Sequence, residues 1–234
     1  MASDTAAVVL AAGSGRRMGG GINKALLPLH GKPLLAHTIQ NLRAAPSVAQ
    51  IVVVMSDLDH QQLQEKWGMD VAALGGDLRV EGDKERWLSC KNGCLAADPA
   101  LPLLLIQDAA RALTQAETTE SVLKACREYG AALAAEPLAD TLKKEGPGGK
   151  VAGTVPRESL WKAQTPQAAT RKLLLQALDA WPGERGVPTD EAMMLEAIGV
   201  APALVPAPAS NFKITFPSDL EMAEAILQAQ ASLS

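Results

Sequence analysis

The stretch that most constrains the fold lies near the start of the chain. Residues 6–11 form an uninterrupted apolar run, and the glycine-rich segment GSGRRMGGGINK follows almost at once. A short apolar run that ends in a glycine loop is typical of a buried parallel strand. Glycine lets backbone N–H groups approach a ligand closely, and Arg16, Arg17 and Lys24 add positive charge to this loop. A strand that opens into a cationic loop rich in amide groups favours the binding of a polyphosphate.

Apolar runs alternate with helical patterns along most of the remaining chain. We expect strands at residues 6–11, 50–55, 78–81, 103–107, 131–135, 203–205 and 212–215, and helices at residues 32–44, 58–67, 84–97, 115–129, 172–181, 189–198 and 217–231. This alternation predicts an α/β fold, a Rossmann-like three-layer sandwich with a mostly parallel central sheet and helices on both faces. Ligands of such sheets bind beyond the carboxyl ends of the strands. The glycine loop and residues 108–111 therefore belong at one edge of the sheet, although they are far apart in the sequence.

Residues 136–160 break this alternation. Their centre, residues 146–149, is Gly-Pro-Gly-Gly, and strand-like pieces flank it at residues 141–143 and 151–155. The pattern predicts a β-hairpin arm that protrudes from a single domain spanning residues 1–234. A two-stranded hairpin is marginally stable alone, so we expect the arm to pack against a second subunit of a homodimer. A mobile surface loop is the alternative interpretation.

Composition narrows the class of protein. The net charge of −4 and the aromatic content of 3% argue against a nucleic-acid binder, which usually carries a basic field or a stacking platform. The three cysteines form no disulfide framework, and we expect them to be core thiols rather than metal ligands. The first residues show no leader pattern, and no apolar run approaches the roughly 20 residues of a membrane span. We therefore expect a cytoplasmic protein that binds neither nucleic acid nor a membrane.

Two familiar phosphate-binding loops do not fit the glycine segment. A dinucleotide-binding GxGxxG read from Gly13 has Met18 in place of its third glycine, which disfavours an oxidoreductase. A P-loop needs Ser or Thr after Gly-Lys, but Pro33 follows Gly31-Lys32. The loop offers cations without a positioned nucleophile or base, which suits nucleotidyl transfer. There a substrate phosphate attacks the α-phosphorus of a nucleoside triphosphate, and cations with Mg²⁺ stabilise the developing charge.

The order and spacing of several motifs resemble those of the 2-C-methyl-D-erythritol 4-phosphate cytidylyltransferases, a family of nucleotidyltransferases. The resemblance runs almost from end to end. Its motifs are Leu10 to Met18, Lys24, Gly31 to Leu35, Gly82-Asp83 with Arg86 and Ser89, Asp108 to Arg111, Asp140-Thr141, Leu160-Trp161, Thr165-Pro166-Gln167, Thr189 to Ala192 and Asn211 to Thr215.

The resemblance implies a role for each matching residue. For binding CTP it implies Ala11, Ala12, Gly13, Ser14, Gly15, Gly82, Asp83, Ser89 and Ala109. Arg17, Lys24 and Lys213 would neutralise the phosphates during catalysis, and Asp108 would hold Mg²⁺. The polyol phosphate would be held by Arg111, Thr141, Arg157 and Thr165. Because Thr141 and Arg157 lie on the arm, they would come from the neighbouring subunit, so the active site would require a dimer.

The chain departs from the family pattern at a few positions, of which Ser210 matters most. An Asp that can help to hold the metal is common there, and the neighbouring Asn211 is a candidate neutral substitute. We expect transfer of CMP from CTP to 2-C-methyl-D-erythritol 4-phosphate with release of pyrophosphate, in non-mevalonate isoprenoid precursor synthesis. The alternatives are a ribitol-5-phosphate cytidylyltransferase and a catalytically weakened homologue that binds the nucleotide as a sensor.

Overall fold

The computed structural model describes residues 3–13, 23–181 and 186–232. Within them the main sheet has seven strands in the order β11-β7-β10-β6-β1-β4-β5. All neighbouring strands pair in parallel except β10, which is antiparallel to both β6 and β7. The strands are β1 (Thr5–Leu10), β4 (Val48–Val54), β5 (Leu78–Val80), β6 (Leu103–Asp108), β7 (Ala131–Pro137), β10 (Trp161–Thr170) and β11 (Ala203–Pro206).

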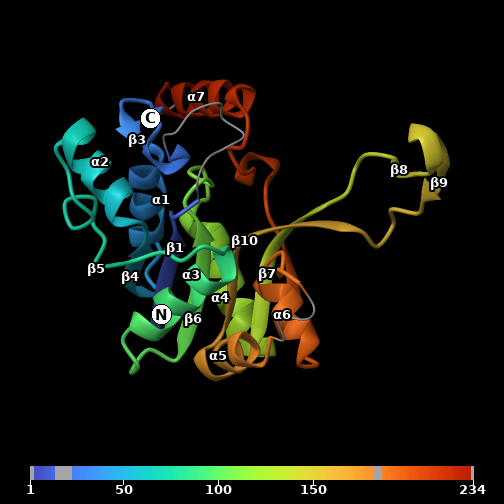
Figure 1. Ribbon diagram of the computed structural model, residues 1–234, viewed down its shortest axis with the longest axis horizontal. Helices are drawn as coiled ribbons and strands as arrows, with labels where there is room; N and C mark the ends of the chain where they lie inside the picture. Colours follow the sequence, from blue (N-terminus) through green and yellow to red (C-terminus); the bar gives the residue numbers. More distant parts are fainter. Residues whose placement is uncertain (1–2, 14–22, 182–185, 233–234) are drawn as a thin grey trace.

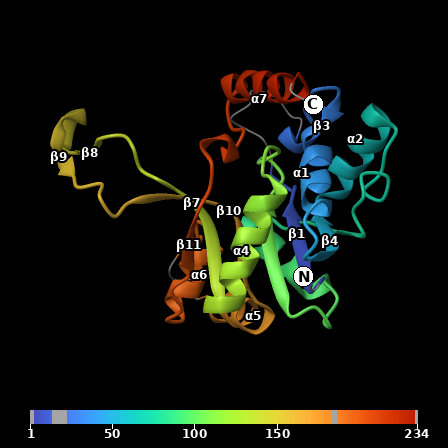
Figure 2. The ribbon, with the colours of Figure 1, turned by 180° about the vertical axis from the view of Figure 1, so that it is seen from behind.

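Helices cover both faces of this sheet (Figures 1 and 2). One core lies between the sheet and α1 (Leu34–Arg43), α2 (Asp57–Trp67) and α4 (Ala116–Tyr129). The other lies between the sheet and α3 (Arg86–Ala96), α5 (Arg171–Ala180) and α6 (Glu191–Ala197). Successive residues of a strand point to opposite faces, and in β1 Ala7 and Val9 enter the first core while Ala6 and Val8 enter the second. The predicted three-layer sandwich is confirmed.

The terminal helix α7 (Pro217–Ala231) lies at the end of the molecule toward which β1 runs (Figure 1). There it packs with Leu29, Leu34 and Leu113 in a third apolar cluster. The short elements at this end are η2 (Lys24–Leu26), β2 (Pro28–Leu29), β3 (Lys32–Pro33) and η5 (Ala209–Asn211).

The strand β10 was not predicted, and two expected elements differ from the structure. Trp161–Thr170 carries Pro166 and few large apolar residues, which disguises a central strand. The ladder to β7 is irregular between Ala163 and Gln167, so Pro166 removes no regular ladder bond there. The expected strand at residues 212–215 is wrong, because no strand includes these described residues. The helix expected from residue 189 begins at Glu191, since Asp190 rather than Thr189 caps it, accepting a bond from Met193 N at 3.0 Å.

The hairpin arm is present as predicted. The strands β8 (Leu142–Glu145) and β9 (Val151–Val155) pair antiparallel in a sheet of their own, joined through η3 (Pro147–Gly149). Both views show the arm extending away from the body of the protein (Figures 1 and 2). Within the described ranges, no helix is long and apolar enough to cross a membrane.

Candidate active site

A pocket of about 410 Å³ opens where β1 and β6 end. The two strands are neighbours, and Leu10 pairs with Asp108 at their last positions. The described residues that follow them, 11–13 and 109–110, line this pocket at one edge of the sheet, as the alternation predicts. Of the residues expected to bind CTP or to act on it, those that line the pocket are Ala11, Ala12, Gly13, Lys24, Asp83, Ser89, Asp108, Ala109 and Lys213. Ser14, Gly15 and Arg17 lie outside the described residues.

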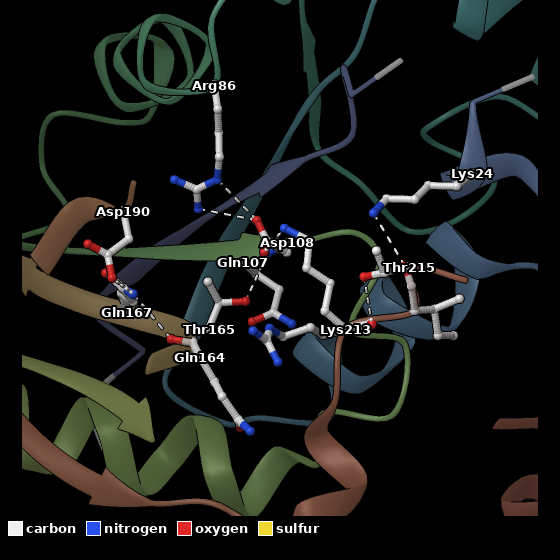
Figure 3. A network of polar contacts seen from close by, with 12 residues as sticks. Lys24, Arg86, Gln107, Asp108, Gln164, Thr165, Gln167, Asp190, Lys213 and Thr215 are labelled. Atoms are coloured by element: carbon white, nitrogen blue, oxygen red, sulfur yellow. Dashed lines mark hydrogen bonds and ion pairs between the residues drawn. The ribbon is translucent and has the colours of Figure 1, made fainter. Parts of the chain in front are cut away.

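Asp108 is the electrostatic centre of this pocket (Figure 3). Its Oδ2 accepts a bond from Lys213 Nζ at 2.7 Å, and its Oδ1 accepts bonds from Arg86 Nη2 at 3.2 Å and Nε at 3.3 Å. Burial alone would raise the pKa of Asp108, but the charges of Arg86 and Lys213 outweigh it and hold that pKa well below its usual range. Asp108 is therefore a carboxylate at neutral pH, despite being only 7% exposed.

Arg86 connects Asp108 to a second carboxylate. Its Nη1 donates to Glu191 Oε1 at 2.7 Å, and its Nη2 donates to Glu191 Oε2 at 3.1 Å. Burial opposes the charge of Arg86, yet Glu191 and Asp108 together raise its pKa. The sequence motifs contain both Arg86 and Glu191. These residues lie at the starts of α3 and α6, and nothing in the sequence indicates that they meet.

Lys24 begins η2 and reaches the segment that carries Lys213. Its Nζ donates to the carbonyl oxygen of Ile214 at 3.3 Å, and Figure 3 shows its side chain extending toward this segment. The preceding residue, Asn23, was not predicted as a site residue. Its side-chain amide donates to the carbonyl of Ala11 and to Asp59 Oδ2, while its oxygen accepts a bond from Ala25 N at 3.0 Å. Asn23 thus links Ala11, shortly before the glycine-rich segment, to Ala25, just after it.

Three of the residues expected to bind CTP, Gly82, Asp83 and Ser89, are brought together. Asp83 N donates to Ser89 Oγ at 2.8 Å, which folds residues 82–84 over the start of α3. A Cβ atom at Gly82 would lie only 2.4 Å from Ala12 Cβ and 3.5 Å from Ser89 Oγ. Glycine is therefore needed at position 82 for the close approach of this segment to the loop after β1.

The four residues expected to hold the acceptor lie in two places. Arg111 and Thr165 are buried beside Asp108: Thr165 Oγ1 accepts a bond from Asp108 N at 3.0 Å, and Arg111 Nη1 donates to the carbonyl of Asn211 at 2.7 Å. Burial lowers the pKa of Arg111, whose Nε has no hydrogen-bond partner among the described residues. Thr141 and Arg157 belong to the arm, and none of the four residues lines the pocket that the described part of one chain forms.

The expectation that Asn211 replaces a metal-binding carboxylate is not supported by its contacts. Asn211 is buried, its Nδ2 donates to Gln164 Oε1 at 2.7 Å and to the carbonyl of Thr165 at 3.0 Å, and its Oδ1 accepts a bond from Thr114 Oγ1 at 2.6 Å. Its amide is already engaged in a polar network beneath the site. Ser210 lies beside it in η5 and supplies no carboxylate.

The side chains of the pocket could hold a magnesium ion only together with a bound nucleotide. Among the described residues, no group of three or more His, Cys, Asp or Glu side chains could hold a metal ion by itself. Asp108 offers one buried carboxylate to the pocket, next to the cations Arg86 and Lys213. Magnesium in nucleotide-using enzymes commonly takes one or two carboxylates and completes its shell with phosphate oxygens and water. Asp108 fits the protein's share of such a shell.

Comparisons with known proteins identify the family. The family model described as "IspD: 2-C-methyl-D-erythritol 4-phosphate cytidylyltransferase" matches residues 5–229. Proteins named 2-C-methyl-D-erythritol 4-phosphate cytidylyltransferase include one from Nitrosomonas eutropha, 39% identical over 96% of this chain and 97% of its own. Another, from Laribacter hongkongensis, is 41% identical over 94% of this chain and 95% of its own.

Solved structures agree with these relatives. The crystal structure of 4-diphosphocytidyl-2C-methyl-D-erythritol synthase from Anaerococcus prevotii superposes with a TM-score of 0.81 at 26% identity, covering 96% of this chain and 98% of that one. The 2-C-methyl-D-erythritol 4-phosphate cytidylyltransferase from Thermus thermophilus gives a TM-score of 0.77 at 30% identity, covering 94% and 98%. With the ordered motifs and this pocket, the chain belongs to the 2-C-methyl-D-erythritol 4-phosphate cytidylyltransferase family.

Proposed function

We propose that this protein transfers CMP from CTP to 2-C-methyl-D-erythritol 4-phosphate and releases pyrophosphate, in non-mevalonate isoprenoid precursor synthesis. The observation that carries the proposal is the pocket at the ends of β1 and β6. It joins Lys24, Lys213 and Asp108 to residues 11–13 after β1 and to the segment from Asp83 to Ser89, in a chain of this family. The site is built for charge stabilisation, as nucleotidyl transfer requires.

The roles of the two lysines follow from the charge that develops during the reaction. The acceptor phosphate is already an anion, so its attack on the α-phosphorus of CTP needs no strong base. Lys213 lies against Asp108, and Lys24 lies against the backbone beside Lys213, so both cations face the same region of the pocket. They would bind the triphosphate and stabilise the negative charge on the pentavalent phosphorus. Asp108 holds the Lys213 ammonium by its Oδ2, at 2.7 Å.

The proposal includes Mg²⁺, with Asp108 as its ligand from the protein. The bound ion would supply further neutralisation of the phosphate oxygens. A titration with CTP in the presence and absence of Mg²⁺ tests this part: we expect tighter CTP binding with the ion in the unaltered protein and little effect of the ion in Asp108→Asn.

The proposal also includes a homodimer in which Thr141 and Arg157 of one subunit complete the acceptor site of the other. Their positions on the protruding arm support it, because neither residue lines the pocket that the described part of one chain forms. Analytical ultracentrifugation tests the dimer directly. The cytoplasmic location expected from the sequence stays a prediction, which cell fractionation can test.

Pyrophosphate release with CTP is the decisive experiment. Parallel reactions would contain 2-C-methyl-D-erythritol 4-phosphate or ribitol 5-phosphate as the acceptor. We expect release with the first acceptor and a much lower kcat/KM with the second. Release with ribitol 5-phosphate alone would contradict the proposed acceptor, and tight CTP binding without release from either acceptor would contradict an enzymatic role.

A further inference from the structure

The buried carboxylate of Glu191 lies at one end of a row of four alternating charges. Its two oxygens bind Arg86 at 2.7 and 3.1 Å, Arg86 binds Asp108 Oδ1 at 3.2 and 3.3 Å, and Asp108 Oδ2 binds Lys213 at 2.7 Å. The row contains two anions and two cations. It extends from the protein interior to the pocket, where Lys213 is predicted to act on the phosphates.

The guanidinium of Arg86 is fixed along two of its edges. Its Nη1 and Nη2 face Glu191, while its Nε and Nη2 face Asp108. A planar guanidinium held by two carboxylates keeps one orientation, because turning it toward one partner would break bonds to the other. The position of Asp108 Oδ1 therefore depends on the bonds that Arg86 makes to Glu191.

Among the described residues, the Glu191 side chain is connected to the pocket through Arg86. It is 1% exposed and is absent from the pocket lining that the described residues form, whereas Arg86 lines that pocket. A buried carboxylate is unfavourable unless it is paired and hydrogen-bonded, and both oxygens of Glu191 are used in this way.

A side chain of β10 holds the two residues that flank Glu191. Gln167 Nε2 donates to Asp190 Oδ2 at 3.1 Å, and Gln167 Oε1 accepts a bond from Ala192 N at 2.9 Å. The same strand carries Thr165, whose Oγ1 accepts a bond from Asp108 N at 3.0 Å. Figure 3 shows Gln167 and Thr165 on this strand, between Asp190 and Asp108. Thus β10 supports Asp108 twice, directly at its backbone and indirectly through Glu191 and Arg86.

We propose that Glu191 is a positioning residue for the reaction, which acts through Arg86 to hold Oδ1 of Asp108 so that Oδ2 faces Lys213. This inference rests on the proposed function, in which Lys213 stabilises the phosphates. It adds a role for Glu191 that neither the sequence pattern nor the pocket lining assigns. The consequence is that a residue outside the pocket sets the turnover rate.

The substitution Glu191→Gln tests the proposal, since it keeps the shape but removes the charge and one acceptor. We expect kcat to fall by about tenfold to a hundredfold, as for other small misplacements of reacting groups. The KM for CTP should change by a smaller factor than kcat, because the substitution leaves the loop after β1 and the bond from Asp83 N to Ser89 Oγ in place. The matched control is Glu120→Gln on α4, which removes another carboxylate that accepts two bonds, from Ser47 N at 2.8 Å and Ser47 Oγ at 2.7 Å. Its kcat should equal that of the unaltered protein, and a kcat near that value in Glu191→Gln would overturn the proposal.

The double variant Arg86→Gln/Glu191→Gln separates positioning from stability. Removing both members of a buried ion pair leaves no unpaired charge, so its thermal midpoint should recover relative to Glu191→Gln. Turnover should stay low, because Asp108 Oδ1 has lost its partner. Recovery of turnover together with the thermal midpoint would show that Glu191 matters for folding alone and would refute its positioning role.

A crystal structure of Glu191→Gln supplies a readout that does not depend on turnover. The expected result is an Asp108 carboxylate turned away from Lys213, with the 2.7 Å contact between Oδ2 and Nζ lost. An unchanged contact would overturn the inference even if the proposed reaction were confirmed. Suppose instead that the carboxylate is displaced in Glu191→Gln and that the unaltered protein is inactive toward the proposed acceptor. The proposed acceptor would then be wrong, and the positioning role of Glu191 would stand.

Discussion

Lys24 and Lys213 line the same pocket from segments far apart in the sequence. If they stabilise the transition state, Lys24→Ala and Lys213→Ala should each lower kcat by roughly 10²- to 10³-fold, by analogy with the loss of one donor to a developing oxyanion. Neither substitution should unfold the protein, since both side chains reach the pocket surface. Steady-state kinetics with a thermal melt of each variant measures both effects. The exposed Lys124 on α4 is the matched control, and turnover near that of Lys124→Ala in either variant would refute the role.

The buried thiol of Cys126 should make the stability of the fold depend on pH, independently of catalysis. Burial raises the pKa of its thiol to about 12. In the unfolded chain a thiol ionises near a pH of about 8.5, so the folded state binds more protons above that pH. The stability contributed by the buried neutral thiol is thus complete below about 8.5 and is lost as the pH rises toward 12, by up to about 1.4 kcal/mol per pH unit.

The variant Cys126→Ala tests this linkage. Denaturant titrations between pH 8 and 10.5 should show that the variant's free energy of unfolding falls less steeply with pH than that of the unaltered protein. The comparison uses slopes, because the substitution itself lowers stability at every pH by leaving a cavity. Parallel slopes would show that Cys126 does not titrate differently in the two states.

For single residues, the sequence indicates which side chains belong to the site far better than it indicates their hydrogen-bond partners. Lys24, Asp108 and Lys213 follow from the motifs, and the pocket contains all three. The bonds from Arg86 to Glu191 and from Asn23 to Asp59 could not be predicted, because each joins residues whose approach depends on the packing of whole elements. A buried carboxylate such as Glu191 shows no periodicity that separates it from an exposed one.

Among the elements, local sequence patterns predicted the parallel strands and their helices. They failed for a strand whose formation depends on its tertiary contacts. The strands β1, β4 and β6 contain continuous apolar runs, at residues 6–10, 51–54 and 103–106, so sequence alone reveals them. The strand β10 is central, yet Pro166 interrupts its pattern, and only its antiparallel pairing with β6 and β7 shows its place. This strand carries Thr165 and Gln167, and its omission also concealed the support of Asp108.

The tight contact between the loop after β1 and the segment before α3 gives a prediction for Gly82→Ala. The new Cβ would lie 2.4 Å from Ala12 Cβ, so one of the two backbones must shift. We expect the KM for CTP to rise several-fold and the free energy of unfolding to fall by about 1–3 kcal/mol, which is typical of overpacking. Kinetics and denaturant titration measure these effects. The double variant Ala12→Gly/Gly82→Ala removes the clashing atom, and it should recover much of the loss; a KM unchanged by Gly82→Ala would show that this contact does not shape the nucleotide pocket.

At the scale of the whole molecule, the arm is the part that extends away from the body of the chain (Figures 1 and 2). The strands β8 and β9 pair only with each other among the described strands, and Leu142 and Val151 are 37% and 66% exposed. Such a hairpin is marginally stable alone. The sequence predicted this arm because glycine and proline mark its turn, and in the proposed dimer a second chain would supply the surface that it packs against.

Mixed dimers test whether the arm completes the neighbouring site. A Lys24→Ala subunit keeps Arg157 on its arm, and an Arg157→Ala subunit keeps Lys24 in its pocket. If the arm crosses to the neighbour, a heterodimer contains one site with both defects and one intact site, so it should show turnover well above that of either homodimer. If the arm serves its own subunit, each site carries one defect and no activity returns. Subunits with different affinity tags, purified in two steps, ensure that heterodimers alone are assayed.

The matched control pairs the double variant Lys24→Ala/Arg157→Ala with an unaltered subunit. Under the crossing arrangement that pair should have a single defect in each site and low activity, whereas under the other it should retain one intact site, so the two pairings give opposite results.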